Sequence, residues 1–180
     1  VRDICPLVHC ITNYVTVNDV ANCILAIGAS PIMADDIAEA ADITSISKAL
    51  VINMGTLNAR TVESMVAAGK KANELAAITG AVDTITDGKR VARISNGHPY
   101  LSKVTGTGCM TTGLVGSFAG ACDDMYTAAV TGIASMGIAG EFAYENAGEI
   151  GSGSFHISII DAISKMNSQV FAAKAKIEEV

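Results

Sequence analysis

The stretch VTGTGCM, residues 104–110, places glycines, threonines and one cysteine at the predicted start of an apolar helix. The first backbone N–H groups of a helix lack partners within it, and the helix dipole adds a positive field there. A glycine such as Gly106 lets the backbone approach an oxyanion or phosphate closely. Cys109 falls in the first turn, where this field favours negative charge. The stretch therefore predicts an anion-binding loop, with a plain tight turn and a core cysteine as the open alternative.

Composition limits the kind of protein to which this loop belongs. The chain has 180 residues, half of them apolar, and a net charge of −6. A chain of this length buries about 70% of its unfolded surface, so it needs no disulfide or metal to hold it together. Because Lys and Arg form no cluster, nucleic acid and anionic membranes are disfavoured as partners. The five cysteines form no CxxC pair, which indicates reduced thiols and a cytoplasmic location.

The first part of the chain alternates strand-type and helical patterns, which is typical of an α/β fold. Apolar runs predict strands within residues 7–13, 30–36 and 49–55. The first helix is expected to end at Gly28. The second is expected to begin near Ile37, with Asp35 or Asp36 as its cap. The third is expected to be capped by Asn58 and to carry Val62, Met65 and Val66 on one side. Met33 falls at the carboxyl end of the second strand, where ligands gather in open α/β sheets.

The second part begins with a predicted hairpin. Residues 81–97 hold two strand-type runs joined by Asp87-Gly88, which predicts a tight turn with positive φ at both central positions. Dense apolar residues at 109–121 and 126–148 predict two buried helices, and a further helix follows before one capped by Asn167. Since the chain shows no repeat and no linker, a single domain is expected.

Long segments of the chain resemble the hydroxyethylthiazole kinases of thiamine salvage, in family order. They include PLVHCITN to PIMADD at 6–36, LVINMGTLNARTVESM onward at 50–74, ITGAVDTITDG at 78–88, ISNGHPYLSKVTGTGC onward at 94–120 and GSGSFH at 151–156. The resemblance implies a ribokinase-like three-layer α/β/α fold with a mainly parallel sheet. It also implies a homotrimeric kinase that uses ATP and Mg²⁺ to phosphorylate the primary alcohol of 4-methyl-5-(2-hydroxyethyl)thiazole.

The resemblance also assigns roles to residues. Gly106, Thr107, Gly108 and Cys109 would form the phosphate-transfer loop, with Cys109 where related sugar kinases carry the aspartate that accepts the hydroxyl proton. Met33 and Gly106 would contact the thiazole. Thr79 in ITGAVD would face the nucleotide.

Other polar residues keep two interpretations. Asn13, Asn18 and Asp19 are expected in the polar loop after the first strand, where they line the thiazole pocket or only cap the next helix. Asp35 and Asp36 could hold a cation through water or merely favour a helix start. His9, within an apolar strand, is expected to be a core histidine. No residue is predicted as a metal ligand.

One departure from the family limits these expectations. The family's DPVGAG-type loop, an arginine and a GN-x-SE-type motif serve ATP and magnesium, and none of them occurs in this chain. Family segment 1–74 is followed directly by family segment 75–180, so one domain without central strands and helices is expected. Two functions therefore remain open, a hydroxyethylthiazole kinase and a catalytically inactive thiazole-binding or assembly protein derived from it.

Overall fold

The computed structural model describes residues 1–53, 59–69 and 83–180. A parallel sheet has the strand order β2 (Ser30–Ile32), β1 (Leu7–Ile11), β3 (Ala49–Ile52). A separate antiparallel sheet has the order β4 (Asp83–Thr86), β5 (Val91–Ile94), β6 (Ile177–Glu179). The helices are α1 (Val17–Ile27), α2 (Ala40–Ile46), α3 (Ala59–Gly69), α4 (Thr107–Ala119), α5 (Met125–Ala147), α6 (Ser152–Ser164) and α7 (Ser168–Lys174). The expected α/β fold is confirmed.

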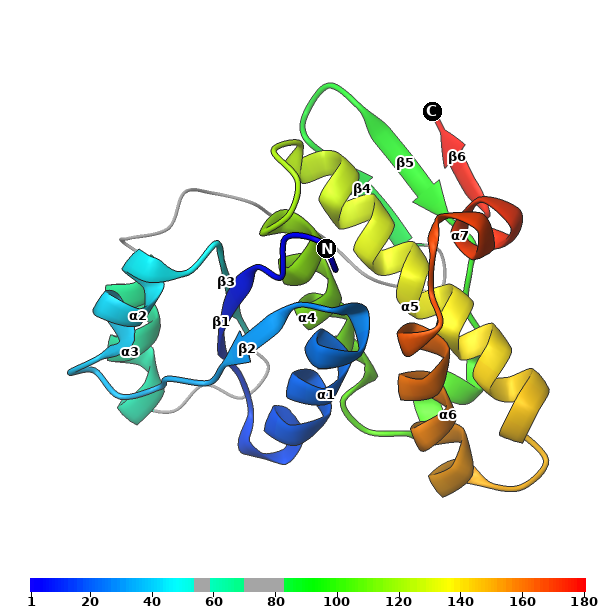
Figure 1. Ribbon diagram of the computed structural model, residues 1–180, viewed down its shortest axis with the longest axis horizontal. Helices are drawn as coiled ribbons and strands as arrows, with labels where there is room; N and C mark the ends of the chain where they lie inside the picture. The colour runs from blue at the N-terminus through cyan, green and yellow to red at the C-terminus, as the bar shows by residue number, and fades with distance from the viewer. Residues whose placement is uncertain (54–58, 70–82) are drawn as a thin grey trace.

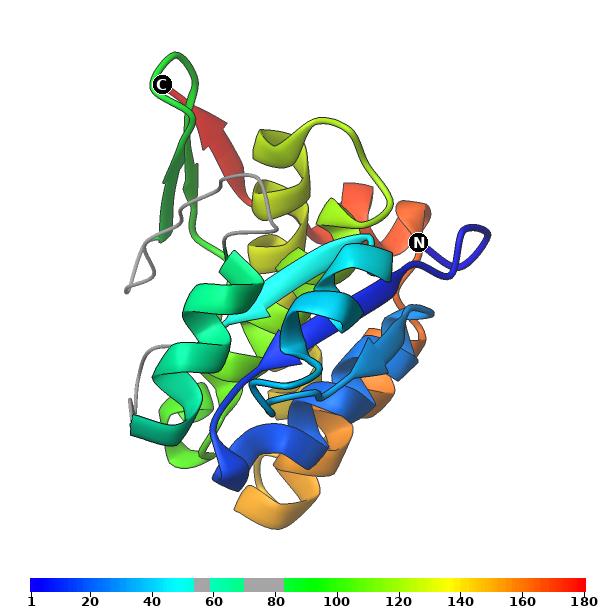
Figure 2. The same cartoon turned by 90° about the vertical axis from the view of Figure 1, so that its left-hand side faces the viewer.

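The parallel sheet is the middle of three layers, with α2 and α3 on one face and α1 and α4 on the other (Figures 1 and 2). Successive side chains of β1 alternate between these layers, as strand geometry requires. Val8 and Cys10 pack with α1 and α4, whereas Ile11 packs with α2 and α3. Both faces of β1 are therefore buried, which explains its continuous apolar run.

The antiparallel sheet lies apart from the parallel one and covers α5 (Figure 1). Ile85, Ala92 and Ile94 form a second core with Tyr126 and Ile133 of α5. The predicted hairpin is confirmed, and β6 adds a third strand that the sequence pattern did not indicate. β6 has the sequence Ile-Glu-Glu, and all three residues are exposed. It therefore lacks the alternation of apolar and polar residues that marks a half-buried strand.

The hairpin turn differs from the expected one. Thr86 pairs with Val91, so four residues form the loop, and only Gly88 has positive φ, at 84°. Asp87 instead accepts hydrogen bonds through Oδ1 from the backbone N–H groups of Lys89 and Arg90. This side-chain cap closes the loop without a second left-handed residue.

An ion pair fastens the hairpin to α5. The two terminal guanidinium nitrogens of Arg90, Nη1 and Nη2, donate to the two carboxylate oxygens of Asp124, at 2.8 and 2.7 Å. The guanidinium also lies 4.2 Å from the centre of the Tyr126 ring. Hydrogen bonds from Arg90 and Thr127 hold the pKa of Asp124 well below its usual range.

Two helices differ from their predicted form. The helix expected from Ile37 begins at Ala40, because Asp36 starts a turn in which its Oδ1 accepts from the N–H of Ala38. In α3, Met65 is buried with Ala68, while Val62 and Val66 are 38% and 50% exposed. Of the three residues predicted on one side of this helix, only Met65 is therefore buried, and the expected cap Asn58 lies outside the described residues.

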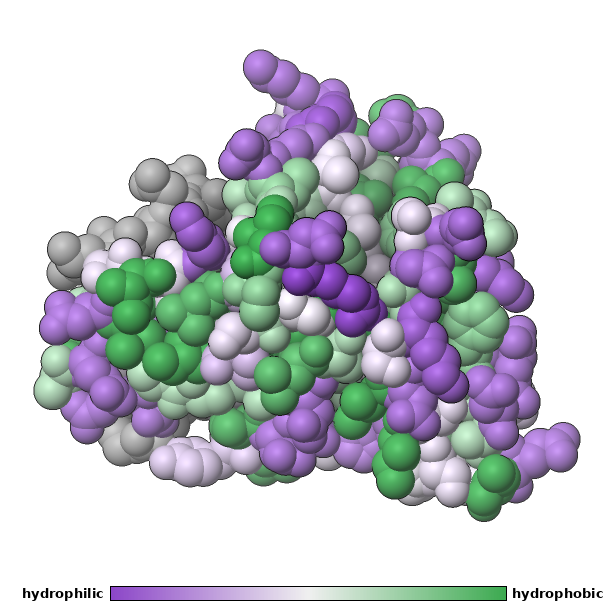
Figure 3. All heavy atoms as spheres, viewed as in Figure 1, coloured by the Kyte–Doolittle hydropathy of each residue, from purple (hydrophilic) through white to green (hydrophobic). Residues whose placement is uncertain are grey.

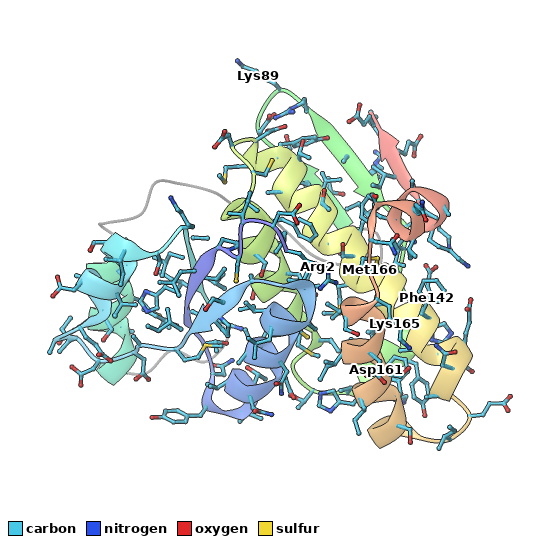
Figure 4. All side chains as sticks on the ribbon, in the orientation of Figure 1. Arg2, Lys89, Phe142, Asp161, Lys165 and Met166 are labelled. Atoms are coloured by element: carbon cyan, nitrogen blue, oxygen red, sulfur yellow. The ribbon has the colours of Figure 1, made fainter. Side chains whose placement is uncertain are left out.

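The other helix ends agree with the sequence. α1 ends at Gly28, whose φ is 96°, and the side chain of Asn167 accepts from the N–H of Val170 at the start of α7. Arg2 ties the amino terminus to the body by donating to the carbonyl oxygens of Ala26, Ser164 and Met166, and it lies beside Met166 in Figure 4.

α4 lies directly on the parallel sheet because glycine faces it. A Cβ on Gly116 would lie 2.4 Å from Val51 Cγ2 and 3.1 Å from Val8 Cγ1. At the far end of the helix, a Cβ on Gly120 would lie 2.8 Å from Cβ of Pro6, which precedes β1. The helix axis therefore approaches the strands more closely than any larger residue would permit.

His9 is a buried core histidine, as expected. It is fully buried, with Nε2 2.7 Å from the carbonyl oxygen of Ala34 and Nδ1 2.8 Å from Thr44 Oγ1. Burial lowers its pKa below the ordinary 6.5, and the hydrogen bond to Ala34 and the charge of Glu39 offset only part of that. The folded state therefore favours the neutral ring.

We expect Gly116→Ala to lower the free energy of unfolding by about 1 to 3 kcal/mol, because the added methyl overpacks the contact with Val51. Urea denaturation measures the change. Gly153→Ala is the matched control, since a Cβ there meets no atom within 4 Å and α6 gains helix propensity. Equal stability of the two variants would contradict the close packing.

We expect the free energy of unfolding to fall as the pH drops below about 6.5, because the unfolded chain then binds a proton that folded His9 resists. The contribution of one group is at most about 1.4 kcal/mol per pH unit. Urea denaturation at pH 7.5 and 5.5 measures it. His9→Gln should lose this part of the dependence, and an unchanged slope in that variant would contradict the assignment.

Candidate active site

The four residues expected in the phosphate-transfer loop lie at the amino terminus of α4. Gly106 is the N-cap, and Thr107, Gly108 and Cys109 form the first turn. α4 runs antiparallel to the strands, since Gly120 lies near the start of β1 and Cys109 touches Asn53, directly after β3. The positive end of the helix therefore faces the carboxyl edge of the sheet, where phosphates bind in α/β folds.

Gly106 is required by both conformation and space. Its φ is 85°, in the left-handed region that favours glycine. A Cβ at this position would also lie 2.7 Å from Cγ2 of Thr16, which is buried at the start of α1. The loop thus turns into α4 while resting on the first turn of α1. Gly108 differs, because a Cβ there meets no atom within 4 Å.

Cys109 has a partner that sequence reasoning missed. Its Sγ accepts a hydrogen bond from Asn53 Nδ2 at 2.7 Å. The backbone N–H of Asn53 donates to the carbonyl oxygen of Ile11, which continues the sheet pairing beyond β3. The amide therefore comes from a fixed part of the sheet and orients the half-buried thiol. The signal was the position of Asn53 directly after a buried strand.

The residues expected to contact the substrate lie at the same sheet edge. Asn13 follows β1 and Met33 follows β2, where Met33 packs against the main core. Asn13 begins the 3₁₀ turn Tyr14–Thr16 through its carbonyl oxygen, which accepts from the N–H of Thr16, and its side chain makes no cap. The structure thus places Asn13, Met33 and Asn53 after three adjacent parallel strands.

Two expectations about this region need correction. Asn18 and Asp19 do not lie in the loop after β1 but within the first turn of α1. Thr79, the residue expected to face the nucleotide, lies outside the described residues, as does the predicted join between Glu74 and Leu75. Of the expected phosphate and nucleotide contacts, the structure describes only those at the amino terminus of α4.

No cluster of three or more His, Cys, Asp or Glu side chains suited to a metal ion occurs within residues 1–53, 59–69 and 83–180. The cysteines are all free thiols. Burial raises the pKa of Cys10 and of Cys23 to about 12, with the charge of Asp19 contributing at Cys23. These two thiols are core residues, which distinguishes them from half-buried Cys109 at the sheet edge.

The sequence model of the hydroxyethylthiazole kinase family matches this chain in two pieces, residues 1–77 and 74–169. The chain belongs to the hydroxyethylthiazole kinase family. A hydroxyethylthiazole kinase of Ruminiclostridium cellulolyticum is 47% identical, with 100% of this chain and 95% of that protein covered. One of Clostridium beijerinckii is 46% identical with the same coverage. These findings confirm the resemblance seen in the sequence.

The fold comparison agrees with the sequence comparison. A solved structure of a hydroxyethylthiazole kinase protein from Pyrococcus horikoshii OT3 has a TM-score of 0.90 and 31% sequence identity. The match covers 99% of this chain and 95% of that one. The arrangement of α1, α4 and the parallel sheet is therefore similar to that in the Pyrococcus structure.

The comparisons also bear on the missing central segment. The alignment with the Ruminiclostridium protein spans 259 positions while the chain has 180 residues, so at least 79 positions have no counterpart here. The two family pieces meet at residues 74–77, next to the predicted join.

Within the described part of the chain, no helix is long and apolar enough to cross a membrane.

Proposed function

We propose that this chain transfers the γ-phosphoryl group of ATP to the primary alcohol of 4-methyl-5-(2-hydroxyethyl)thiazole, in thiamine biosynthesis. The family membership supports the reaction, and one feature of the fold carries it: the left-handed Gly106 opens α4 toward the carboxyl edge of the sheet. Free backbone N–H groups and the helix dipole at that point suit a group of negative charge.

The backbone amides of the loop stabilise charge, and the sulfur of Cys109 accepts the proton. In the reaction the alcohol oxygen bonds to the γ-phosphorus, the bond to the bridging oxygen breaks, and ADP leaves. The amides from Gly106 to Cys109 stabilise the phosphoryl oxygens during transfer, which is the larger contribution because this chemistry depends mainly on positioning and charge. Cys109 acts as a thiolate that receives the hydroxyl proton and becomes a thiol, and the amide of Asn53 orients its sulfur.

The acceptor is held beside this loop. We place Met33 against the thiazole ring and Asn13 and the backbone of Gly106 at its polar groups, since Asn13 and Met33 follow adjacent strands at the edge that α4 faces. The partial exposure of Met33, which also packs on the core, suits one wall of an apolar pocket.

The donor side is only partly supported by the described residues. The α4 amino terminus suits the phosphates of ATP, and the resemblance assigns the nucleotide contact to Thr79. A kinase of this family would use Mg²⁺ to neutralise the phosphates, yet the described residues offer no cluster of carboxylates for it. Asp36 already accepts from the N–H of Ala38. The described residues therefore form no magnesium site by themselves.

We further propose one domain over residues 1–180, assembled as a cytoplasmic homotrimer. Tyr14 and Val15, next to Asn13, are 76% and 77% exposed, and a neighbouring subunit would cover them. On the face shown in Figure 3, other apolar side chains form separate green groups among polar ones. Free cysteines throughout agree with a reducing compartment.

The greater length of the relatives supports a second candidate function. Because 79 or more aligned positions are missing, the acceptor side can persist in a protein that binds the thiazole without phosphorylating it. The deciding experiment incubates the purified chain with Mg-ATP and hydroxyethylmethylthiazole and detects the phosphorylated thiazole by mass spectrometry. Product formation at turnover supports the kinase. Thiazole binding by calorimetry without product supports the binding protein.

Replacing Cys109 should slow the transfer without abolishing it. We expect Cys109→Ala to lower kcat about 10- to 100-fold, because the proton acceptor is lost while the amides of α4 remain. Cys122→Ala is the matched control, since Cys122 is a half-buried thiol just beyond the opposite end of α4. Full turnover by Cys109→Ala would remove the thiol from the mechanism.

A further inference from the structure

A contact between α1 and α6 lies directly behind the phosphate loop. His156 Nε2 is 3.1 Å from Asp19 Oδ1, and the two side chains are 29% and 15% exposed. The distance is that of an ion pair, yet Nε2 is sealed from solvent without a hydrogen bond among the described residues. A buried ring nitrogen without such a bond is uncommon and calls for an explanation.

The other oxygen of this carboxylate faces the loop. Asp19 Oδ2 lies 3.8 Å from where a Cβ on Gly106 would be, and Thr16, one turn earlier, fills the rest of that space. Asp19 thus stands between His156 and the N-cap of α4. The two oxygens of one carboxylate face the two neighbouring helices.

Aromatic packing fixes α6 in this place. Phe155, next to His156, is fully buried, and its ring meets the edge of Tyr100 at 4.9 Å between centroids. Tyr100 belongs to the 3₁₀ segment Pro99–Lys103 that leads into the loop, and Thr107 Oγ1 donates to the carbonyl oxygen of Leu101 in the same segment. α6 therefore supports the loop from two directions.

A carboxylate at this position has an electrostatic cost. Asp19 is favourable for the dipole of α1, but its charge also lies beside the N–H groups that would receive a phosphate. The charge of Asp19 also acts on a neighbouring thiol. The pKa of Cys23 is raised mainly by burial, and the charge of Asp19 is the second cause. Without a counter-charge, Asp19 would repel the phosphate and compete for the same donors.

We propose that the Asp19–His156 pair positions Gly106 and cancels the negative charge behind the phosphate loop. The ring of His156, whose Nε2 lies 3.1 Å from Asp19 Oδ1, holds this oxygen toward α6, so that only Oδ2 faces the loop. His156 and Asp19 are positioning residues, because neither has to touch a substrate. This role rests on the proposed function of the α4 amino terminus as a phosphate site.

The test uses the full chain and two readouts. Hydrogen exchange of the amides at residues 104–110 reports the position of the loop, and calorimetric titration with inorganic pyrophosphate reports its affinity for an anion. The variants are His156→Ala, Asp19→Asn and the double variant. Arg90→Ala is the matched control, since it also removes the cation of an aspartate ion pair, but near the opposite end of α4.

His156→Ala should weaken pyrophosphate binding about 10-fold and speed exchange in the loop, while Arg90→Ala changes neither. Adding Asp19→Asn to His156→Ala should restore the affinity to within about 2-fold of the unmodified chain, because the uncompensated charge is then gone. A purely structural contact would give additive losses instead, and that result would overturn the charge role. Wild-type affinity and exchange in His156→Ala would overturn the whole inference.

Failure of the proposed function has a different signature. If the unmodified chain binds no pyrophosphate, the phosphate site fails, whereas exchange in the loop still decides whether the pair positions Gly106. Faster exchange only in His156→Ala would then support the positioning role by itself, and unchanged exchange would overturn it.

Discussion

The close approach of α4 to the parallel sheet is the constraint on which the rest of the structure depends. Gly116 lets the helix rest on Val8 and Val51, where one methyl group would already collide with a core side chain. This contact fixes both the depth and the direction of α4. The amino terminus of the helix therefore reaches the carboxyl edge of the sheet, and Cys109 meets Asn53 there. A larger residue at position 116 would displace α4 from Val51 and so shift the loop at the amino terminus of the helix.

In the proposed site, strands β1 to β3 and the start of α1 surround the loop at the amino terminus of α4. Asn13, Met33 and Asn53 follow strands β1, β2 and β3, while Thr16 and Asp19, at the start of α1, lie next to Gly106. Pre-organised amides cost little reorganisation during a phosphoryl transfer, so rigidity here favours the reaction. The relatives carry further sequence that this chain lacks, and the described residues hold the proposed acceptor side and transfer loop.

Much of the fold could be predicted because its signals are local. Apolar runs marked β1 and β3, Gly28 marked the end of α1, and Asn167 marked the start of α7. The predictions failed where a side-chain hydrogen bond changed the path of the backbone. Asp87 closed its loop with hydrogen bonds instead of a second positive φ, and Asp36 began a turn that moved the start of α2 to Ala40.

The sequence by itself determined the family, the layered α/β architecture and the position of Gly106 to Cys109 at a helix start, because each depends on residues close together in the chain. Only the tertiary structure decided which distant groups meet there. Asn53 is 56 residues from Cys109, and His156 is far along the chain from its partner Asp19. Such pairs leave no periodic or spacing signal, since packing of helices on the sheet brings them together.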